Sequence, residues 1–387
     1  MKLFIILSRV PYPLEKGDKL RAFNQIVELS KKHEIYLFAF NDTKLHPLAT
    51  ETLNKYCKKV TIFNLSILSI FLNIIKAFFK VLPIQIGYFY NKKAHKILLS
   101  ELKDFNPDHI FCQIIRVSEY VKDIKTPKTL DYQDAFSKGL ERRISKSNIF
   151  QKPFFILEFL RVKKYETKIF DYFDNKIIIS EQDKKYINHP KSNEIEVVIN
   201  GVDTNYYNST ENHNKIYDLI FVGNMNYPPN IDAVCYVVKE ILPLLNEKIN
   251  FIIAGANPSK KVQSLASNRV FVTGWIDDLR GYYSKSKIFI APMQIGIGLQ
   301  NKLLEAMAMK IPCITSKLAN NALGGTHNKN ILIGETPSDY AYYINELLLN
   351  KDKIEEISNN GHDYILNNFS WKNSVAKLET IFYRNSK

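Results

Sequence analysis

The chain has 387 residues, of which 45% are hydrophobic and 24% are charged. This balance excludes a disordered chain, and the length suits two domains of about 150–200 residues better than a single core. The formal net charge is +14, and residues 1–200 carry most of it, with 34 lysines and arginines against 22 acidic residues. We therefore expect the first half to meet an anionic partner, such as a phosphate group or an anionic membrane surface.

The first residues and the cysteines indicate the cellular compartment of the protein. Residues 1–7 are largely apolar, but Arg9 and Pro11 follow at once, so we expect a buried first strand and no secretory signal. The four cysteines are scattered and form no close pairs, which argues against a disulfide framework and against a zinc site. We expect a cytoplasmic protein.

Short apolar runs alternate along the chain with longer segments of helical periodicity. The runs are residues 2–7, 35–40, 60–63, 109–112, 129–131 and 176–180, and then 218–222, 250–254, 270–272, 287–291, 313–315 and 331–333. Apolar strands separated by helices are typical of parallel sheets covered on both faces. The sequence therefore predicts an α/β protein with two doubly wound Rossmann-like domains. We place the boundary at residue 200 and a polar linker at 205–214.

Residues 66–82 are strongly apolar, but Lys76 and Lys80 interrupt them. The uninterrupted apolar run is too short for a helix that spans a membrane. One interpretation is a buried helix of the first domain. The other is a helix lying in the membrane interface, with its lysines reaching toward anionic headgroups, which a second aromatic and basic stretch at 150–165 supports.

The strongest local pattern follows the apolar run at 287–291. A loop with Gly296 and Gly298 leads into a helical segment that starts near Leu299. A helix start attracts anions, and glycines let the backbone approach them closely. Lys302 stands one turn inside, within reach of a phosphate, and Glu305 one turn further, where its carboxylate could accept hydrogen bonds from ribose hydroxyls. Alternatively, the segment is an ordinary turn with both side chains in solvent.

Five stretches, in chain order, resemble glycosyltransferase family 4. They are residues 8–21, 200–203 (Asn-Gly-Val-Asp), 221–225, 272–276 and 296–312, the last containing the helix with Glu-Ala-Met-Ala. Residues 8–21 resemble a subgroup associated with bacterial exopolysaccharide synthesis. The resemblance implies two domains that face each other across a cleft (the GT-B type), a nucleotide-sugar donor, and transfer with retention of the anomeric configuration. It also implies that the last helix, within 366–387, returns to domain 1–200 from donor domain 201–365.

The resemblance also implies roles for individual donor-site residues. Glu305 would hold the ribose and Gly17 would approach the diphosphate from the first domain. The others would line the donor cleft, contact the diphosphate and sugar, or border the base: Gly223, Asn224, Trp275, Ile276, Gly296, Gly298, Leu299, Gln300 and Asn301.

The sequence departs from the family pattern at two places. Ile297 stands where the family often has a glutamate, so we expect Gln294 or backbone amides to bind the sugar hydroxyls. Residues 224–230 contain neither the Arg nor the Lys that often follows the first turn of the second domain, and we expect Lys302 to supply that charge. Because a helix start and one ammonium could stabilise the leaving diphosphate, we expect a reaction without a metal or other cofactor.

The acceptor side is less clearly marked. Ligands of open α/β sheets bind beyond the carboxyl ends of the strands, so Asp131 or Asp134 could orient the acceptor hydroxyl. An aspartate that caps the next helix is an equal alternative for either residue. Asp18 and Arg116 are weaker acceptor candidates, and a surface arginine is the alternative for Arg116.

The predicted function is transfer of a sugar from a nucleotide-diphosphate sugar to a glycan or lipid-linked acceptor of a bacterial surface polysaccharide, at the inner face of the plasma membrane. A sugar-nucleotide epimerase of the same fold is an alternative, because it would use a similar donor cleft. A basic nucleic-acid-binding protein would explain the charge but leaves residues 296–305 unexplained, and we expect no nucleic acid as a partner.

Overall fold

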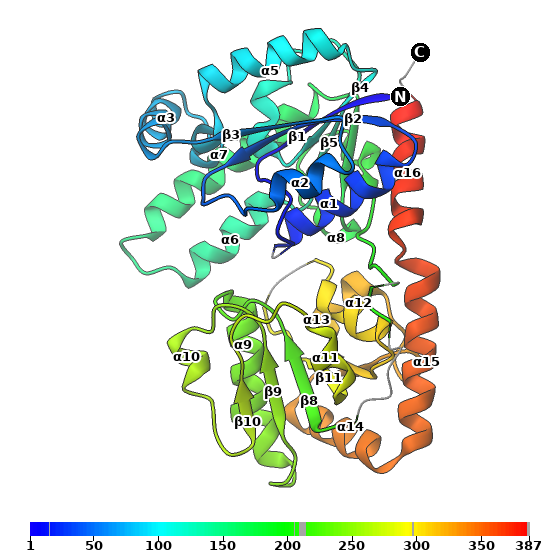
Figure 1. The fold of residues 1–387 in the computed structure, drawn as a ribbon. Helices are drawn as coiled ribbons and strands as arrows, with labels where there is room; N and C mark the ends of the chain where they lie inside the picture. Colours follow the sequence, from blue (N-terminus) through cyan, green and yellow to red (C-terminus); the bar gives the residue numbers. More distant parts are fainter. Residues whose placement is uncertain (15, 205, 209–213, 296–297, 385–387) are drawn as a thin grey trace. The chain divides into compact units, whose positions relative to one another are not determined.

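The computed structural model describes residues 1–14, 16–204, 206–208, 214–295 and 298–384. The chain forms two compact units, one of Met1–Ile199 with Trp371–Lys387 and the other of Asn200–Ser370 (Figure 1). The first boundary lies beside the predicted one. The chain returns to the first unit at Trp371 and not at 366, because the preceding helix continues to Asn368 within the second unit.

Unit 1 is built on a seven-stranded sheet in the order β3-β2-β1-β4-β5-β6-β7, in which every pair of neighbours is parallel. Its strands are β1 Lys2–Leu7, β2 Glu34–Asn41, β3 Lys59–Asn64, β4 His109–Gln113, β5 Lys128–Asp131, β6 Asn175–Ile178 and β7 Glu196–Val197. Its helices are α1 Gly17–Ser30, α2 Ala49–Asn54, α3 Ile67–Phe79, α4 Ile84–Phe89, α5 Lys92–Phe105, η1 Ile115–Tyr120, α6 Phe136–Lys146, α7 Lys152–Phe170, α8 Glu181–Lys184, η2 Ser192–Glu194 and α16 Trp371–Tyr383.

Unit 2 is built on a six-stranded parallel sheet in the order β10-β9-β8-β11-β12-β13. Its strands are β8 Tyr217–Val222, β9 Phe251–Ala254, β10 Val270–Val272, β11 Ser286–Ala291, β12 Cys313–Ser316 and β13 Leu332–Gly334. Its helices are α9 Pro228–Tyr236, η3 Val237–Ile241, η4 Leu242–Leu244, α10 Lys260–Gln263, α11 Arg280–Ser284, α12 Asn301–Ala308, α13 Lys317–Leu323, α14 Pro337–Leu349 and α15 Lys351–Asn368.

Both faces of the unit 1 sheet are buried, which is why its strands are apolar throughout. Phe4 and Ile6 of β1 point into one hydrophobic cluster, and Leu3 and Ile5 point into a second cluster on the opposite face. This alternation follows from the two-residue period of a strand. The predicted fold class, two doubly wound α/β domains, is confirmed.

The last helix belongs to unit 1, as the resemblance implied. Leu378, Ile381 and Phe382 of α16 are buried in the same cluster as Leu3 and Ile5 of β1. Its Glu379 carboxylate accepts a hydrogen bond from Lys32 Nζ at 2.8 Å and lies 2.8 Å from His33 Nε2. The C-terminal helix is therefore an integral part of the first unit.

Each predicted strand appears within two residues of its expected bounds, and the two-residue strand β7 was not predicted. A pair of residues is too short to show a period of two.

Candidate functional site

The strands of unit 2 are parallel, so their carboxyl ends meet at one edge of the sheet, where two chain segments come very close. Gly255, directly after β9, has a φ of +138°, and a Cβ on it would lie 2.0 Å from the Gly223 carbonyl oxygen. The Gly255 N–H donates to Thr273 Oγ1 at 3.0 Å. Only glycine fits this contact. The contact lies at the edge of the sheet that carries the candidate site.

The predicted anion-binding helix is α12, and it begins at Asn301, two residues after the expected start. The residue before it, Gln300, makes no side-chain cap. Gly298 has a φ of +93°, so its place in the loop suits glycine, whereas Gly296 and Ile297 lie outside the described residues. A side chain from the Asn-Gly-Val-Asp stretch reaches the helix start, because Asn200 Nδ2 donates to Asn301 Oδ1 at 3.4 Å.

Lys302 lies on the first turn of α12 and is half-buried. Its ammonium donates to Asn230 Oδ1 and lies 4.6 Å from the centroid of the Phe221 ring. Burial lowers the pKa of Lys302 to about 7, although the nearby Glu305 carboxylate opposes this shift. In its charged form, the ammonium lies near a helix start and is hydrogen-bonded to a neutral amide, so it is well suited to bind an anion.

Asn230 connects Lys302 to the predicted turn after β8. Its Nδ2 donates to the Asn224 carbonyl at 3.0 Å. A Cβ on Gly223 would meet the same Nδ2 at 2.5 Å, so the glycine makes room for the amide. Asn230 was not predicted, because an asparagine six residues after a predicted turn residue carries no signal of its own.

Glu305 faces two tyrosines. Its Oε2 accepts a hydrogen bond from the Tyr283 hydroxyl at 2.9 Å, and the Tyr207 hydroxyl interacts with the same carboxylate. Burial raises the pKa of Glu305, while Tyr283 and Lys302 oppose the shift. Tyr207 lies within the stretch predicted as a linker. Tyr207 thus packs against the site, whereas residues 205 and 209–213 of that stretch lie outside the described residues.

The other predicted donor residues lie at or near the same edge. Trp275 follows β10, is 58% exposed, and donates from Nε1 to Asp277 Oδ1 at 2.8 Å. Ile276, Leu299 and Gln300 are half-buried, and Gln294, after β11, is exposed. The edge thus carries an exposed aromatic ring, a cation and a carboxylate, which could serve a base, a phosphate and a sugar ring respectively.

In unit 1, the burial of Asp131 overturns one prediction for the acceptor side. Asp131 ends β5 with its side chain fully buried, and its Oδ2 accepts from Arg21 Nε at 2.7 Å. Its Oδ1 accepts from the Gln133 N–H at 3.0 Å. Both carboxylate oxygens are therefore engaged inside the protein, and the prediction that Asp131 orients an acceptor is wrong.

Asp134 differs from Asp131 because its side chain is exposed. It does not cap the next helix, since the N-cap of α6 is Ala135. Surrounding protein and the Asp183 and Asp131 carboxylates raise the pKa of Asp134 to about 7. Of the two aspartates, only Asp134 is available to a ligand.

The weaker acceptor candidates lie near the start of α1. Gly17 is its first residue and is exposed, and Asp18 accepts from Arg9 Nη1 at 2.7 Å. Arg116 is no surface arginine: it is half-buried, with its guanidinium carbon 5.7 Å from the Phe89 ring and 4.9 Å from the Phe136 ring. Burial and the neighbouring Arg9 lower its pKa to about 10.

A family model described as "Glycosyl transferases group 1" matches residues 217–350, which include α9, α12 and most of the candidate site. Across nearly the whole chain, the sequence is 24% identical to a protein in the cps region of Klebsiella pneumoniae that is described as uncharacterized. That alignment covers 97% of this chain and 98% of the relative.

Solved structures share the fold over the full length. Sucrose-phosphate synthase from Thermosynechococcus elongatus has a TM-score of 0.71 at 13% identity, and the alignment covers 99% of each chain. The Anabaena protein HepE, in complex with UDP and glucose, has a TM-score of 0.70 at 12% identity, also with 99% of each chain covered. We conclude that residues 217–350 of the second unit match a family of glycosyl transferases and that the chain has the two-Rossmann GT-B fold.

Proposed function

We propose that the protein transfers a sugar from a nucleotide-diphosphate sugar to a glycan or lipid-linked acceptor, with retention of the anomeric configuration. The observation that carries the proposal is the arrangement of Lys302 and Glu305 on α12, beside the turn after β8. The Anabaena relative of the same fold binds UDP and glucose, which supports a donor of this class.

Cleavage of the sugar–phosphate bond develops negative charge on the leaving diphosphate. The start of α12 and the Lys302 ammonium would stabilise that charge. A bound diphosphate would raise the pKa of Lys302 from about 7 and so keep the side chain charged when the bond breaks. In this proposal the protein needs no metal ion.

Glu305 would hold the ribose of the donor. A carboxylate has lone pairs for about four hydrogen bonds, so the bond from Tyr283 leaves room for ribose hydroxyls and fixes the orientation of the group. The base would lie against Trp275 and Ile276. Gly17 would approach the diphosphate from unit 1.

On the acceptor side, Asp134 would orient the attacking hydroxyl, and Asp18 and Arg116 would contact the rest of the acceptor. Asp134 is the better candidate because its carboxylate is exposed and its raised pKa of about 7 suits exchange of a proton at neutral pH. Retention would follow from attack on the face that the diphosphate leaves, without a covalent intermediate on the protein.

The proposed biological role is synthesis of a bacterial surface polysaccharide, on the cytoplasmic side of the plasma membrane. The similarity to a Klebsiella protein in the cps region supports this role. The four cysteines are buried and free, which is consistent with a reducing compartment.

The test is incubation of the purified protein with a panel of labelled nucleotide sugars and a bacterial lipid extract, with and without EDTA. We expect transfer of label to an acceptor and no loss of rate with EDTA. Isomerisation of the donor without transfer would instead support an epimerase, and binding to nucleic acid alone would support the third alternative; either result contradicts the proposal.

A matched pair of variants tests the role of Lys302. We expect Lys302→Ala to lower kcat about 100- to 1000-fold, the usual cost of removing one group that stabilises a developing anion. Lys310→Ala removes an exposed lysine just beyond the other end of α12 and should leave the rate unchanged. Donor turnover by Lys302→Ala at the wild-type rate would refute the assigned role.

A further inference from the structure

Helix α3 of unit 1 is oriented with its apolar side outward. Its only buried residue is Ala77, which lies so close to α4 that a Cβ on Gly87 would be 2.3 Å from the Ala77 Cβ. Asn73 also faces the protein, where it donates to the Tyr90 carbonyl at 2.6 Å. The large apolar side chains are exposed instead: Ile67, Leu68, Phe71, Leu72, Ile75, Phe78 and Phe79. Of the two interpretations of residues 66–82, the buried helix is wrong.

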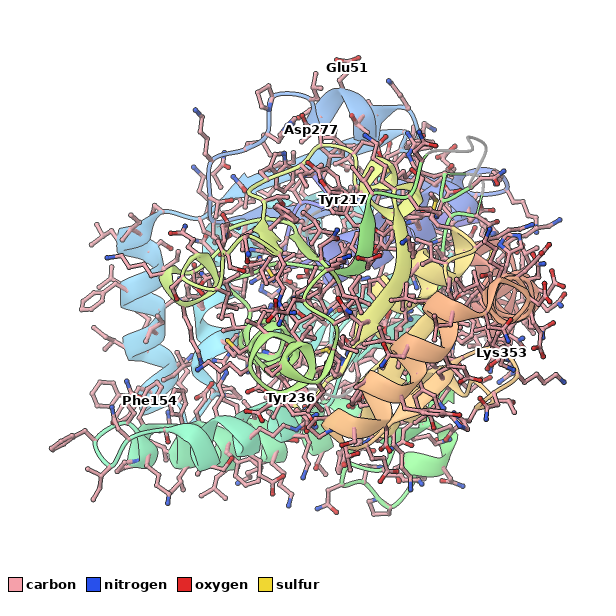
Figure 2. The ribbon with its side chains drawn as sticks, turned by 90° about the horizontal axis from the view of Figure 1, so that it is seen from below. Glu51, Phe154, Tyr217, Tyr236, Asp277 and Lys353 are labelled. Atoms are coloured by element: carbon pink, nitrogen blue, oxygen red, sulfur yellow. The ribbon has the colours of Figure 1, made fainter. Side chains whose placement is uncertain are left out.

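A second exposed apolar group lies at the start of α7 and in the residues before it. Its members are Ile149, Phe150, Phe154, Ile156, Leu157 and Leu160, and Phe150 is 90% exposed. Figure 2 shows Phe154 at the free end of α7, on the side of unit 1 that carries α3. Large exposed apolar patches mark interaction surfaces in soluble domains.

The two groups belong to one surface because α3 and α7 are tied together. Arg161 of α7 donates from Nη2 to the Phe78 carbonyl at 3.2 Å, and its guanidinium carbon lies 4.7 Å from the Phe78 ring centroid. Glu158 of α7 accepts from the N–H of Ile84, at the start of α4, at 3.0 Å. We call the exposed apolar side chains of α3 and of residues 149–160 the apolar face.

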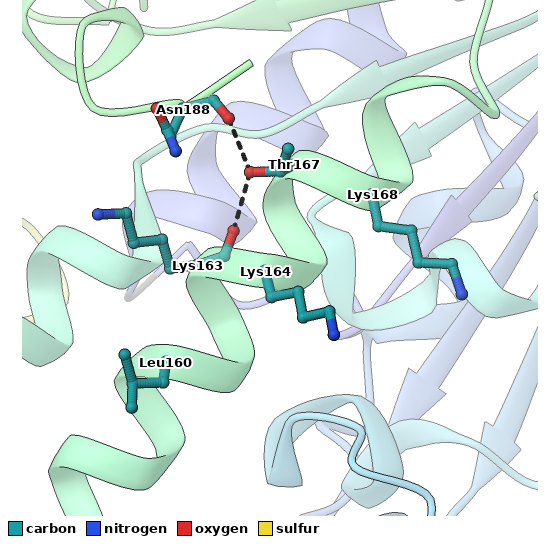
Figure 3. Close-up of a pocket in the computed structure, with 6 residues that line it drawn as sticks. All are labelled: Leu160, Lys163, Lys164, Thr167, Lys168 and Asn188. Atoms are coloured by element: carbon teal, nitrogen blue, oxygen red, sulfur yellow. Dashed lines mark hydrogen bonds between the residues drawn. The ribbon is translucent and has the colours of Figure 1, made fainter.

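The exposed side of α7 becomes basic where the apolar face ends. Beyond Leu160, its exposed residues include Lys163, Lys164 and Lys168. These lysines, with Leu160, Thr167 and Asn188, line a shallow hollow of about 460 Å³ (Figure 3). The single hydroxyl proton of Thr167 is shared between the Lys163 carbonyl, 3.1 Å from Oγ1, and the Asn188 carbonyl, 2.8 Å from it. Leu160 therefore belongs both to the apolar face and to a lysine-lined hollow.

Further exposed lysines lie on or beside the helices of the apolar face and on α5. Lys76 and Lys80 lie on α3 and just after it, Lys92 and Lys93 start α5, and Lys152 starts α7. An apolar surface with a border of ammonium groups is complementary to the edge of an anionic lipid layer, where acyl chains lie beneath phosphate headgroups. The described residues include no helix long and apolar enough to cross a bilayer.

We propose that the apolar face inserts into the surface of an anionic membrane, with the exposed ammonium groups of Lys163, Lys164 and Lys168 meeting lipid phosphates beside it. The occupant is a lipid layer and not a protein groove, because exposed lysines accompany the apolar residues on three helices, α3, α5 and α7. Insertion would hold unit 1 at the bilayer surface, where a lipid-linked acceptor would be found. This last step rests on the proposed function, whereas membrane binding itself does not.

The apolar part of the proposal is tested by sedimentation of the full chain with vesicles of phosphatidylglycerol and phosphatidylcholine. We expect the double variant Phe71→Ser and Phe79→Ser to bind about tenfold more weakly, because both rings are exposed in the protein and would be buried in the lipid. The matched control, Tyr342→Ser with Leu349→Ser, removes two exposed apolar residues of unit 2 and should bind like wild type.

The basic part is tested with the same vesicles and with vesicles of phosphatidylcholine alone. We expect wild type to prefer the anionic vesicles and each of Lys163→Gln, Lys164→Gln and Lys168→Gln to weaken that binding about fivefold. High salt should have the same effect. The matched control neutralises exposed lysines of unit 2, by Lys260→Gln, Lys261→Gln and Lys310→Gln, and should change the affinity less than twofold.

UDP binding, measured on every variant, separates this inference from the proposed function. Weakened vesicle binding with unchanged UDP binding supports the membrane surface. Wild-type protein that binds UDP but does not bind vesicles, or that binds both lipid mixtures equally, refutes it and leaves the proposed function in place. A dimer that dissociates in the Phe71→Ser and Phe79→Ser variant, without vesicle binding, would show that a second copy covers the face.

Discussion

The two units place charged side chains beside the carboxyl edges of their sheets in opposite ways. In unit 1, Asp131 and Arg21 form an ion pair in which both side chains are fully buried. In unit 2, Lys302 and Glu305 are half-buried and are held by neutral partners, Asn230 and Tyr283. A charge bound by an opposite charge inside the protein has little left to offer a ligand, whereas a charge held by neutral groups can still attract one.

Residue type and nearness to the carboxyl edge of a sheet therefore do not by themselves identify a binding residue. Asp131 ends β5 and Glu305 lies on α12, and both carboxylates were predicted to take part in the reaction. The hydrogen-bond partner of each carboxylate determines whether it is available to a ligand. Asp131 is committed to holding α1 against β5, while the hydrogen bond from Tyr283 orients Glu305 and leaves it available.

The largest expected effect tests whether the ion pair of unit 1 is structural. Arg21→Met leaves the Asp131 carboxylate buried without its cation, so we expect the free energy of unfolding to fall by about 3–5 kcal/mol. Urea denaturation followed by circular dichroism measures the loss. Lys31→Ala removes an exposed ion pair with Glu28 and should cost less than about 1 kcal/mol. Equal effects of the two substitutions would contradict the distinction.

The next largest effect concerns the close backbone contact between Gly255 and Gly223 in unit 2. Gly255→Ala places a methyl group against the Gly223 carbonyl in a backbone region that favours glycine, and we expect a loss of about 1–3 kcal/mol. In Gly274→Ala the added methyl group meets no atom within 4 Å, so a change within about 0.5 kcal/mol is expected. If Gly255→Ala unfolds at the same urea concentration as wild type, the close approach is not real.

A third prediction uses the pKa of about 7 for Lys302. Below pH 7 the ammonium is already charged, and above pH 7 the free protein must take up a proton to bind a diphosphate. We therefore expect the Kd for UDP to rise about fivefold from pH 7 to pH 8 and about 15-fold from pH 7 to pH 8.5, as measured by calorimetry. Lys302→Met should bind weakly, without this rise. A wild-type Kd that is constant over this range would contradict the prediction.

The smallest effect concerns the neutral partner of Glu305. Tyr283→Phe removes the hydroxyl that donates to the carboxylate, and we expect the free energy of unfolding to fall by about 1 kcal/mol. UDP affinity should fall as well, because the carboxylate loses its fixed orientation. The control Tyr342→Phe alters an exposed tyrosine of unit 2 and should have no measurable effect on either quantity. If both variants behave alike, Tyr283 does not position Glu305.

The amino-acid sequence was enough to predict every strand but β7, the order of the elements and the division near residue 200, and it marked the segment around α12 as the candidate site. Each of these is local: apolar runs bounded by turns predict strands, and a glycine loop before an amphipathic helix predicts an anion-binding start. The start of α12 was misplaced by two residues, because helix ends depend on cap geometry as well as on periodicity.

Which side chains are available to a ligand depends on contacts between residues that lie far apart in the sequence. Asn230 and Tyr283 lie 72 and 22 positions from the residues they hold, so no local pattern reveals them. Arg21 lies 110 positions from Asp131, and its pairing removed that aspartate from the acceptor side. The sequence pattern of the apolar residues of α3 is the same whether their side chains are buried or exposed. In α3, Ala77, Asn73 and Ile70 face the rest of unit 1, and the large apolar side chains named above face outward, because burial depends on the packed neighbours and not on the residue type alone.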